Sequence, residues 1–88
     1  SLGVSDFETK EIISLYPNPV KDILVINASS EDELVFELYT MDGKIIQTRT
    51  FSKATQINVA DFASGLYLYT VKNKDQAIIK KATINIAH

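Results

Sequence analysis

The chain has 88 residues, 45% of them apolar and 23% charged, with a net charge of −2 and with no cysteine or tryptophan. This length suits one domain with a modest core, and the lack of cysteine excludes disulfides, zinc–thiolate sites and cysteine nucleophiles. No apolar run approaches the roughly 20 residues of a membrane helix, and no signal peptide opens the chain, so we expect any export signal to lie on a longer precursor.

Residues 1–12 differ from the rest of the chain because they are polar and show no regular apolar alternation. Ser5 followed by Glu8 fits a capping box, which would allow one helical turn. Without an apolar period behind it, a linker is the better interpretation. We therefore divide the chain into a linker over residues 1–12 and a folded domain over residues 13–88.

Both prolines lie in the stretch Tyr16-Pro17-Asn18-Pro19, directly after the first strand-like segment. Each proline fixes its own φ and holds the preceding residue in an extended conformation. The Asn18 side chain can bond to nearby backbone and steady the bend. We predict a rigid stop here between the first strand and the second.

The rest of the chain reads as short strands separated by turns. The run 22–28 is continuously apolar, as in a strand that is covered on both sides or lies at the centre of a sandwich. Alternation in the other runs predicts three sets of side chains that each share one face: Leu34, Phe36 and Leu38; Tyr67, Tyr69 and Val71; and Ala82, Ile84 and Ile86. Phe62, in the turn before 66–72, is expected to point inward. Asp42-Gly43 is the strongest turn signal, because both residues tolerate the positive φ of a tight hairpin. Seven strands are predicted, at residues 12–15, 22–28, 34–40, 44–51, 55–59, 66–72 and 76–86. This number and spacing predict an all-β, antiparallel sandwich.

Charge is divided unevenly along the chain. Residues 1–40 carry eight acidic and two basic side chains, whereas residues 41–88 carry three acidic and seven basic ones. Such asymmetry can mark an interaction surface. In a fold whose halves interleave, it more often means that oppositely charged strands become neighbours, and we expect the latter.

We find no residue pattern for catalysis, cofactor binding or metal coordination, and we predict that the domain is not an enzyme. His88, the only histidine and the last residue, is expected at a free chain end rather than in a catalytic triad. The adjacent acids Glu31, Asp32 and Glu33 suit a solvated loop, and the three glycines are too isolated for a phosphate loop. Lysines on the last hairpin do not suffice for nucleic-acid binding in an acidic chain, and edge lysines normally oppose strand pairing.

Several short motifs follow one another in a specific order. After the leader LGVSDFE (2–8) come YPNP (16–19), DGK (42–44), FASGLYLYTVK (62–72) and the lysine pair Lys80-Lys81. Each motif alone is ordinary turn or strand sequence. Together they resemble the C-terminal sorting domains (type A) of Bacteroidetes proteins that leave the cell through the type IX (Por) secretion system, from about Leu15 to Ile86.

The resemblance implies an Ig-like antiparallel β-sandwich of about seven strands that acts as a secretion signal. Such a domain forms the C-terminus of a larger exported protein and is recognised by the outer-membrane type IX translocon. A sortase-like surface peptidase then cuts in or before the leader, here around Ser1 to Ile12, and the N-terminally fused cargo is anchored to lipopolysaccharide or released. The implied location is the cell surface or the medium, reached through the periplasm and outer membrane, with no cofactor, nucleic acid or membrane insertion.

Under this resemblance, candidates for partner recognition are Lys80, Lys81, Gly65 and Tyr67. The last strand, with its two lysines, would present an edge for strand addition or a basic patch for charge pairing. The structural signature consists of Tyr16, Pro17, Asn18, Pro19, Asp42, Gly43, Gly65 and Tyr67.

Two non-enzymatic alternatives remain open. An accessory Ig-like or fibronectin-like interaction module could bind glycan if exposed aromatic residues, such as Tyr39, Phe51 or Tyr69, shared one face. A structural stalk would differ from a sorting signal because its deletion would harm the stability of the cargo rather than its location.

Overall fold

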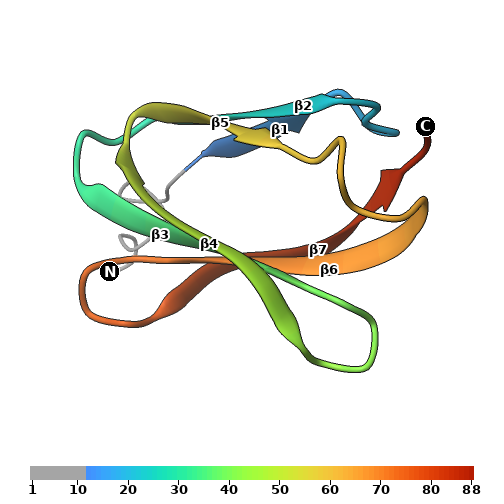
Figure 1. Cartoon of the computed structure of the whole chain (residues 1–88). Coiled ribbons are helices and arrows are strands. Elements are labelled where there is room, and N and C mark those ends of the chain that lie inside the picture. Colours follow the sequence, from blue (N-terminus) through green and yellow to red (C-terminus); the bar gives the residue numbers. More distant parts are fainter. Residues whose placement is uncertain (1–11) are drawn as a thin grey trace.

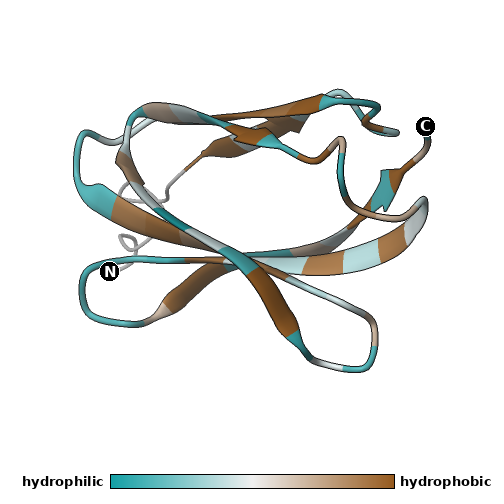
Figure 2. Cartoon of the chain, viewed as in Figure 1, coloured by the Kyte–Doolittle hydropathy of each residue, from teal (hydrophilic) through white to brown (hydrophobic). Residues whose placement is uncertain are grey.

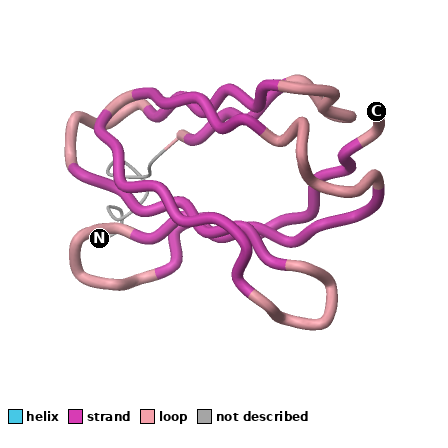
Figure 3. Tube along the Cα trace, viewed as in Figure 1, coloured by secondary structure: helices cyan, strands magenta, loops and turns pink. Residues whose placement is uncertain are grey.

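A computed structural model describes residues 12–88, which form two antiparallel β-sheets packed face to face (Figure 1). Throughout this part of the chain, strands are joined by loops and turns, and no helix interrupts them (Figure 3). The proposed capping box at Ser5 and Glu8 lies outside the described residues. The strands are β1 (Ile13–Tyr16), β2 (Ile23–Ala28), β3 (Glu33–Tyr39), β4 (Ile45–Ser52), β5 (Ala54–Asn58), β6 (Gly65–Lys72) and β7 (Ile78–Ile86).

One sheet has the strand order β1-β2-β5, and the other has the order β4-β3-β6-β7. This is the Ig-like antiparallel sandwich that the sequence predicts, and each predicted strand lies within two residues of the observed one. The apolar strand β2 is central in its sheet, as expected. It is not covered on both sides, because Ile23 on its outer face is 40% exposed.

The core lies between the sheets and is formed by alternate residues of each strand, as the period-2 patterns require. The predicted inward sets are confirmed in β3, β6 and β7, and Phe62, in the loop before β6, packs against the core. The largest fully buried side chains are Phe36, Leu24, Ile26, Leu34, Leu38, Ile57, Ile84 and Ile86.

The β3–β4 hairpin differs from the predicted tight turn. Of Asp42 and Gly43, only Gly43 has a positive φ, at 98°. Gly43 N–H donates to the Thr40 carbonyl (2.9 Å), and Thr40 N–H donates to the Lys44 carbonyl (2.9 Å). The loop therefore has three residues. A three-residue loop needs only one residue with positive φ, whereas the predicted two-residue turn would need two.

The β6–β7 hairpin repeats this hydrogen-bond pattern without glycine. Gln76 N–H donates to the Asn73 carbonyl (3.0 Å), and Asn73 N–H donates to the Ala77 carbonyl (2.9 Å). Gln76 takes the left-handed position with a φ of 69°. A side chain there is strained, because the left-handed region favours glycine.

Both edge strands of the four-stranded sheet contain a β-bulge. The register of β4 against β3 shifts at Ile46, and that of β7 against β6 shifts at Ile79. Each extra isoleucine packs against the core. The two bulges therefore turn apolar side chains inward at the long borders of the sandwich.

Within residues 12–88, two ion pairs join the acidic first half of the chain to the basic second half, as expected from the charge distribution. Lys72 Nζ lies 3.1 Å from Glu37 Oε1, and Lys53 Nζ lies 3.6 Å from Glu31 Oε2. The charge asymmetry along the sequence is thus partly compensated by strand neighbours in the fold.

Candidate recognition surface

The proline segment does more than end β1, because it reaches across the sandwich to β7. Asn18 Oδ1 accepts a hydrogen bond from the Asn85 N–H (3.2 Å), and Val20 N–H donates to the Asn85 carbonyl (2.9 Å). Val20 is fully buried and forms a parallel bridge with Ile86. The predicted local role of Asn18 is therefore wrong, since its backbone partner lies on the last strand. Both X–Pro bonds of the segment are cis.

The residues after β7 are held between the proline segment and the loop before β6 (Figure 1). Ala87 N–H donates to the Val20 carbonyl at 2.9 Å. His88 N–H donates to Ser64 Oγ at 3.2 Å, and its Nε2 lies 2.5 Å from the Phe62 carbonyl oxygen. The expectation of a free chain end at His88 is thus wrong.

Gly65 and Tyr67, at the start of β6, shape the fold. Gly65 has a φ of 151°, and an added Cβ would meet no atom within 4 Å, so glycine is favoured there for its backbone conformation alone. Tyr67 is buried, and its hydroxyl donates to the Ala63 carbonyl at 2.6 Å. This arrangement matches the tyrosine corner of immunoglobulin-like sandwiches, which stabilises the same connection.

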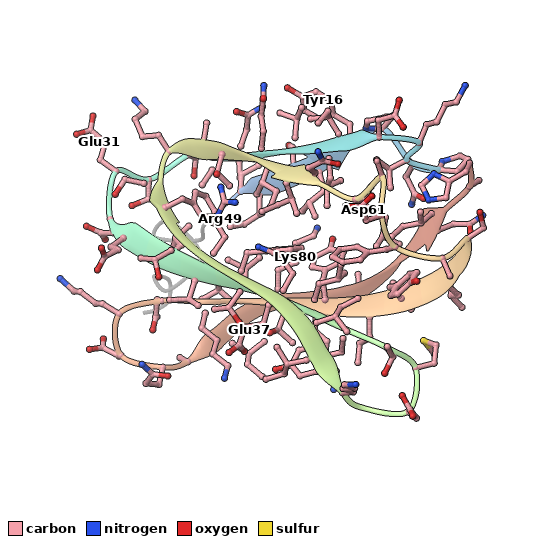
Figure 4. The ribbon with its side chains drawn as sticks, viewed as in Figure 1. Tyr16, Glu31, Glu37, Arg49, Asp61 and Lys80 are labelled. Carbon is pink, nitrogen blue, oxygen red and sulfur yellow. The ribbon has the colours of Figure 1, made fainter. Side chains whose placement is uncertain are left out.

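The lysine pair Lys80-Lys81 does not form one patch. Lys80 pairs with the buried Val71, so its side chain starts on the inner face of the sheet, and it lies between the sheets (Figure 4). Lys81 pairs with Thr70 on the outer face and is exposed. Adjacent residues of a strand point to opposite faces, so of the two only Lys81 extends the outer surface.

A polar network centred on Glu37 occupies the outer face of the four-stranded sheet. Glu37 Oε1 accepts hydrogen bonds from the Tyr39 hydroxyl (2.8 Å) and from Thr70 Oγ1 (3.4 Å), and it is paired with Lys72. The Tyr39 hydrogen bond first, and the Lys72 ammonium second, lower the pKa of Glu37 below its ordinary value although partial burial opposes this. Sequence reasoning missed this network, although antiparallel pairing of β3 and β6 would have brought these four residues together.

Arg49 links the two sheets at the β4 border. It pairs with the buried Phe36, so it starts on the inner face, and Figure 4 shows it between the sheets. One guanidinium nitrogen, Nη1, donates to Thr55 Oγ1 (3.2 Å) and to the Gln56 carbonyl (3.2 Å), both on β5. No sequence pattern pointed to this contact.

The aromatic platform proposed for glycan binding is not formed. Phe51 and Tyr69 are buried in the core, where Tyr69 packs against Phe36 with ring centroids 5.8 Å apart and burial raises its pKa. Tyr39 points to the opposite face of its sheet. These three residues therefore cannot share one exposed face.

Among residues 12–88, no group of three histidine, cysteine, aspartate or glutamate side chains is placed to hold a metal ion. No helix in the same range is long and apolar enough to cross a membrane.

The chain matches the model of a known protein family. Its family model, described as "Secretion system C-terminal sorting domain", covers residues 14–85. The match begins in β1 and ends in β7, so it includes both prolines, the tyrosine corner and the contact between Asn18 and Asn85. No curated protein matches the chain.

Proposed function

The chain belongs to the secretion-system C-terminal sorting domains, which are the export signals of the type IX pathway, and we propose that the outer-membrane translocon recognises and binds the folded domain itself. A type IX sorting signal directs its protein to the cell surface or the medium, as part of a longer precursor. In this role the domain is a ligand of the export machinery and performs no chemistry of its own.

The observation that carries this proposal is the extent of the family match. It reaches into all seven strands rather than only a terminal peptide. The segments near both ends of the match also contact each other: the Val20 N–H donates to the Asn85 carbonyl, and the Asn85 N–H donates to Asn18 Oδ1. This favours recognition of a folded surface over recognition of an extended tail.

We propose further that a sortase-like peptidase cuts in or just before residues 1–12, after which the cargo is anchored to lipopolysaccharide or released. Figure 1 shows β1 beginning toward one end of the sandwich and the C-terminus at the other. A cut before β1 would leave the contacts of Asn18, Val20 and His88 in place. Recognition at the sandwich and removal at the linker could then proceed without interfering with each other.

Among the recognition candidates Lys80, Lys81, Gly65 and Tyr67, we assign a direct partner contact to Lys81 alone. Its side chain is exposed on the outer face. Tyr67 is buried, Gly65 has no side chain, and Lys80 starts on the inner face. These three support recognition indirectly, by maintaining the sandwich.

A reporter fusion tests the proposal. Residues 1–88 are joined to the C-terminus of a periplasmic reporter in a host with an active type IX system and in an isogenic host without it. We expect the reporter at the cell surface or in the medium only in the first host, with the domain removed within or before residues 1–12. Reporter that remains in the periplasm of both hosts would refute the sorting role.

The same fusion separates sorting from a stalk function. If the domain only stabilises its cargo, deleting it would lower the amount of reporter without changing its compartment. For the contact residue, Lys81→Glu is compared with Lys74→Glu, a matched change in the exposed β6–β7 turn. We expect export to fall only for Lys81→Glu, because only that lysine lies on the proposed surface.

A further inference from the structure

The outer face of the four-stranded sheet consists of rows of side chains that cross neighbouring strands. One row is polar and contains Thr48, Glu37, Thr70 and Lys81. The next row, nearer the β3–β4 hairpin, contains Ile45, Tyr39, Leu68 and Thr83. Leu66 continues this second row along β6, because it lies two residues before Leu68 on the same face. We term Ile45, Tyr39, Leu68 and Leu66 the apolar strip.

The apolar strip is open to solvent at both ends. Ile45 is 49% exposed and Leu66 is 51% exposed, with the partly buried Tyr39 and Leu68 between them. In Figure 2 apolar colour covers the start of β4 and recurs in bands along β6. Single exposed aliphatic residues are ordinary, whereas a continuous strip across three strands is typical of an interaction surface.

Charge beside the apolar strip is unbalanced. Glu37 is compensated by Lys72, which lies 3.1 Å away. Lys81 forms no ion pair with any residue from 12 to 88, although it lies in the row next to the strip. The face therefore combines apolar surface with one uncompensated positive charge, which is complementary to an apolar surface that carries a carboxylate.

The edges of the four-stranded sheet are poorly suited to strand addition. β4 and β7 each have a bulge, and each directs a cation toward the interior, Arg49 from β4 and Lys80 from β7. Inward-pointing charges and bulges are devices by which proteins prevent an added strand from pairing. The C-terminal end of β7 is also occupied, by Asn18 and Val20.

The edges of the other sheet are short. β1 has four residues and ends at Tyr16, directly before Pro17. β5 has five residues, and its Gln56 carbonyl already accepts a hydrogen bond from Arg49. A partner of this domain is therefore expected to bind a sheet face rather than extend a sheet.

We propose that the apolar strip and Lys81 form the surface that docks on the outer-membrane export machinery. The matching site on that machinery is an apolar patch with a carboxylate opposite Lys81. This inference rests on the proposed function, and it replaces strand addition at β7 by face-to-face contact. A second copy of the chain is a poorer occupant, because the only carboxylate in the two rows, Glu37, is already paired with Lys72.

The test compares equivalent charge insertions on the two outer faces. Ile45→Lys and Leu66→Lys, combined in the reporter fusion, place charge in the strip without touching the core. The matched control is Ile23→Lys, because Ile23 is 40% exposed on the outer face of the other sheet. We expect the strip variant to lower the exported fraction about tenfold or more, the loss typical of a binding hot spot, and the control to export normally.

Thermal unfolding of the purified variants establishes that they are folded. A photo-crosslinking amino acid at position 66 of the otherwise unaltered domain provides a second measurement, which does not depend on the charge variants. We expect position 66 to crosslink to an outer-membrane component of the export machinery, identified by mass spectrometry, and position 23 not to do so.

The outcomes separate the inference from the function on which it rests. Failure of the unaltered domain to export the reporter refutes both. Normal export of a folded strip variant refutes the docking surface alone. Crosslinking from position 66 to a second copy of the chain or to the fused reporter, instead of the export machinery, also refutes it.

Discussion

Asn18 and Asn85 lie 67 residues apart in the sequence, yet the Asn18 side chain accepts a hydrogen bond from the Asn85 backbone N–H at 3.2 Å. Val20 extends this contact by its parallel bridge to Ile86. The proline segment thus pairs with the outer edge of β7 where that strand ends. One short motif near the start of the domain therefore fixes the position of its last strand.

Replacing Asn18 by alanine tests the energetic contribution of this contact. Asn18→Ala removes the acceptor for the Asn85 N–H, so the free energy of unfolding should fall by about 0.5–1.5 kcal/mol. Asn18→Asp keeps an acceptor oxygen and should lose less. Urea unfolding of the purified domain measures both, and equal stability of Asn18→Ala and the unaltered domain would contradict the assigned role.

Tyr67→Phe tests whether the tyrosine corner stabilises the sandwich. The change removes the 2.6 Å hydrogen bond to the Ala63 carbonyl while the ring stays in the core. We expect a loss of about 1 kcal/mol in the free energy of unfolding, and a folded domain that still exports its reporter. Loss of export from a stably folded Tyr67→Phe domain would instead indicate that the translocon contacts this hydroxyl.

The two equivalent hairpins predict a stabilising substitution. Gln76 has a φ of 69° at the position where the β3–β4 hairpin has Gly43. Gln76→Gly should therefore raise the free energy of unfolding by about 0.5–1 kcal/mol, because glycine relieves the left-handed strain at some cost in chain entropy. The reciprocal change Gly43→Gln should lower it. Urea unfolding should give changes in the free energy of unfolding of opposite sign for the two variants. A destabilising Gln76→Gly would refute the equivalence of the two hairpins.

The Glu37 network predicts a defined pH dependence. The pKa of Glu37 in the folded domain lies below its ordinary value of 4.5, first because of the Tyr39 hydrogen bond and then because of Lys72. The unfolded chain therefore takes up this proton at a higher pH than the folded domain. The resulting stability is present above about pH 4.5 and is lost as the pH falls through the lower pKa of the folded state.

Carbon-13 NMR titration of the Glu37 carboxyl group measures this shift. Tyr39→Phe removes its largest cause, so the pKa of Glu37 should rise toward the ordinary value. Tyr16→Phe is the matched control, because the Tyr16 hydroxyl accepts a hydrogen bond from the Asn27 amide instead of donating to Glu37. In parallel, Glu37→Gln should flatten the decline of unfolding free energy below pH 4.5, and an unchanged slope would refute the assignment.

Lys80→Val tests whether the inward cation protects the edge of β7. Without this charge the strand presents a longer apolar edge, and we expect the domain to self-associate at high concentration. Lys80→Arg keeps an inward cation and should behave as the unaltered domain does. Size-exclusion chromatography with light scattering distinguishes the two variants, and a monomeric Lys80→Val domain would show that the bulge at Ile79 suffices.

Much of the fold was predictable because the relevant physics is local. The alternation of apolar and polar residues, together with the turn residues, predicted seven strands and the side chains that face the core. Because Ala82, Ile84 and Ile86 face inward, the same alternation implied that Lys80 also points inward. The alternation therefore already contradicted the prediction that Lys80 and Lys81 form one basic patch. The order of motifs also indicated the family, which depends on the sequence alone.

Only the tertiary structure decided which distant groups meet. The partner of Asn18 on β7, the Glu37 network and the contact of Arg49 with β5 each depend on how strands far apart in sequence are arranged. Period-2 alternation says which face a side chain occupies, but not which strand lies beside it or opposite it. For that reason the sequence alone determined the strands and the family, whereas the proposed docking face became visible only in the assembled four-stranded sheet.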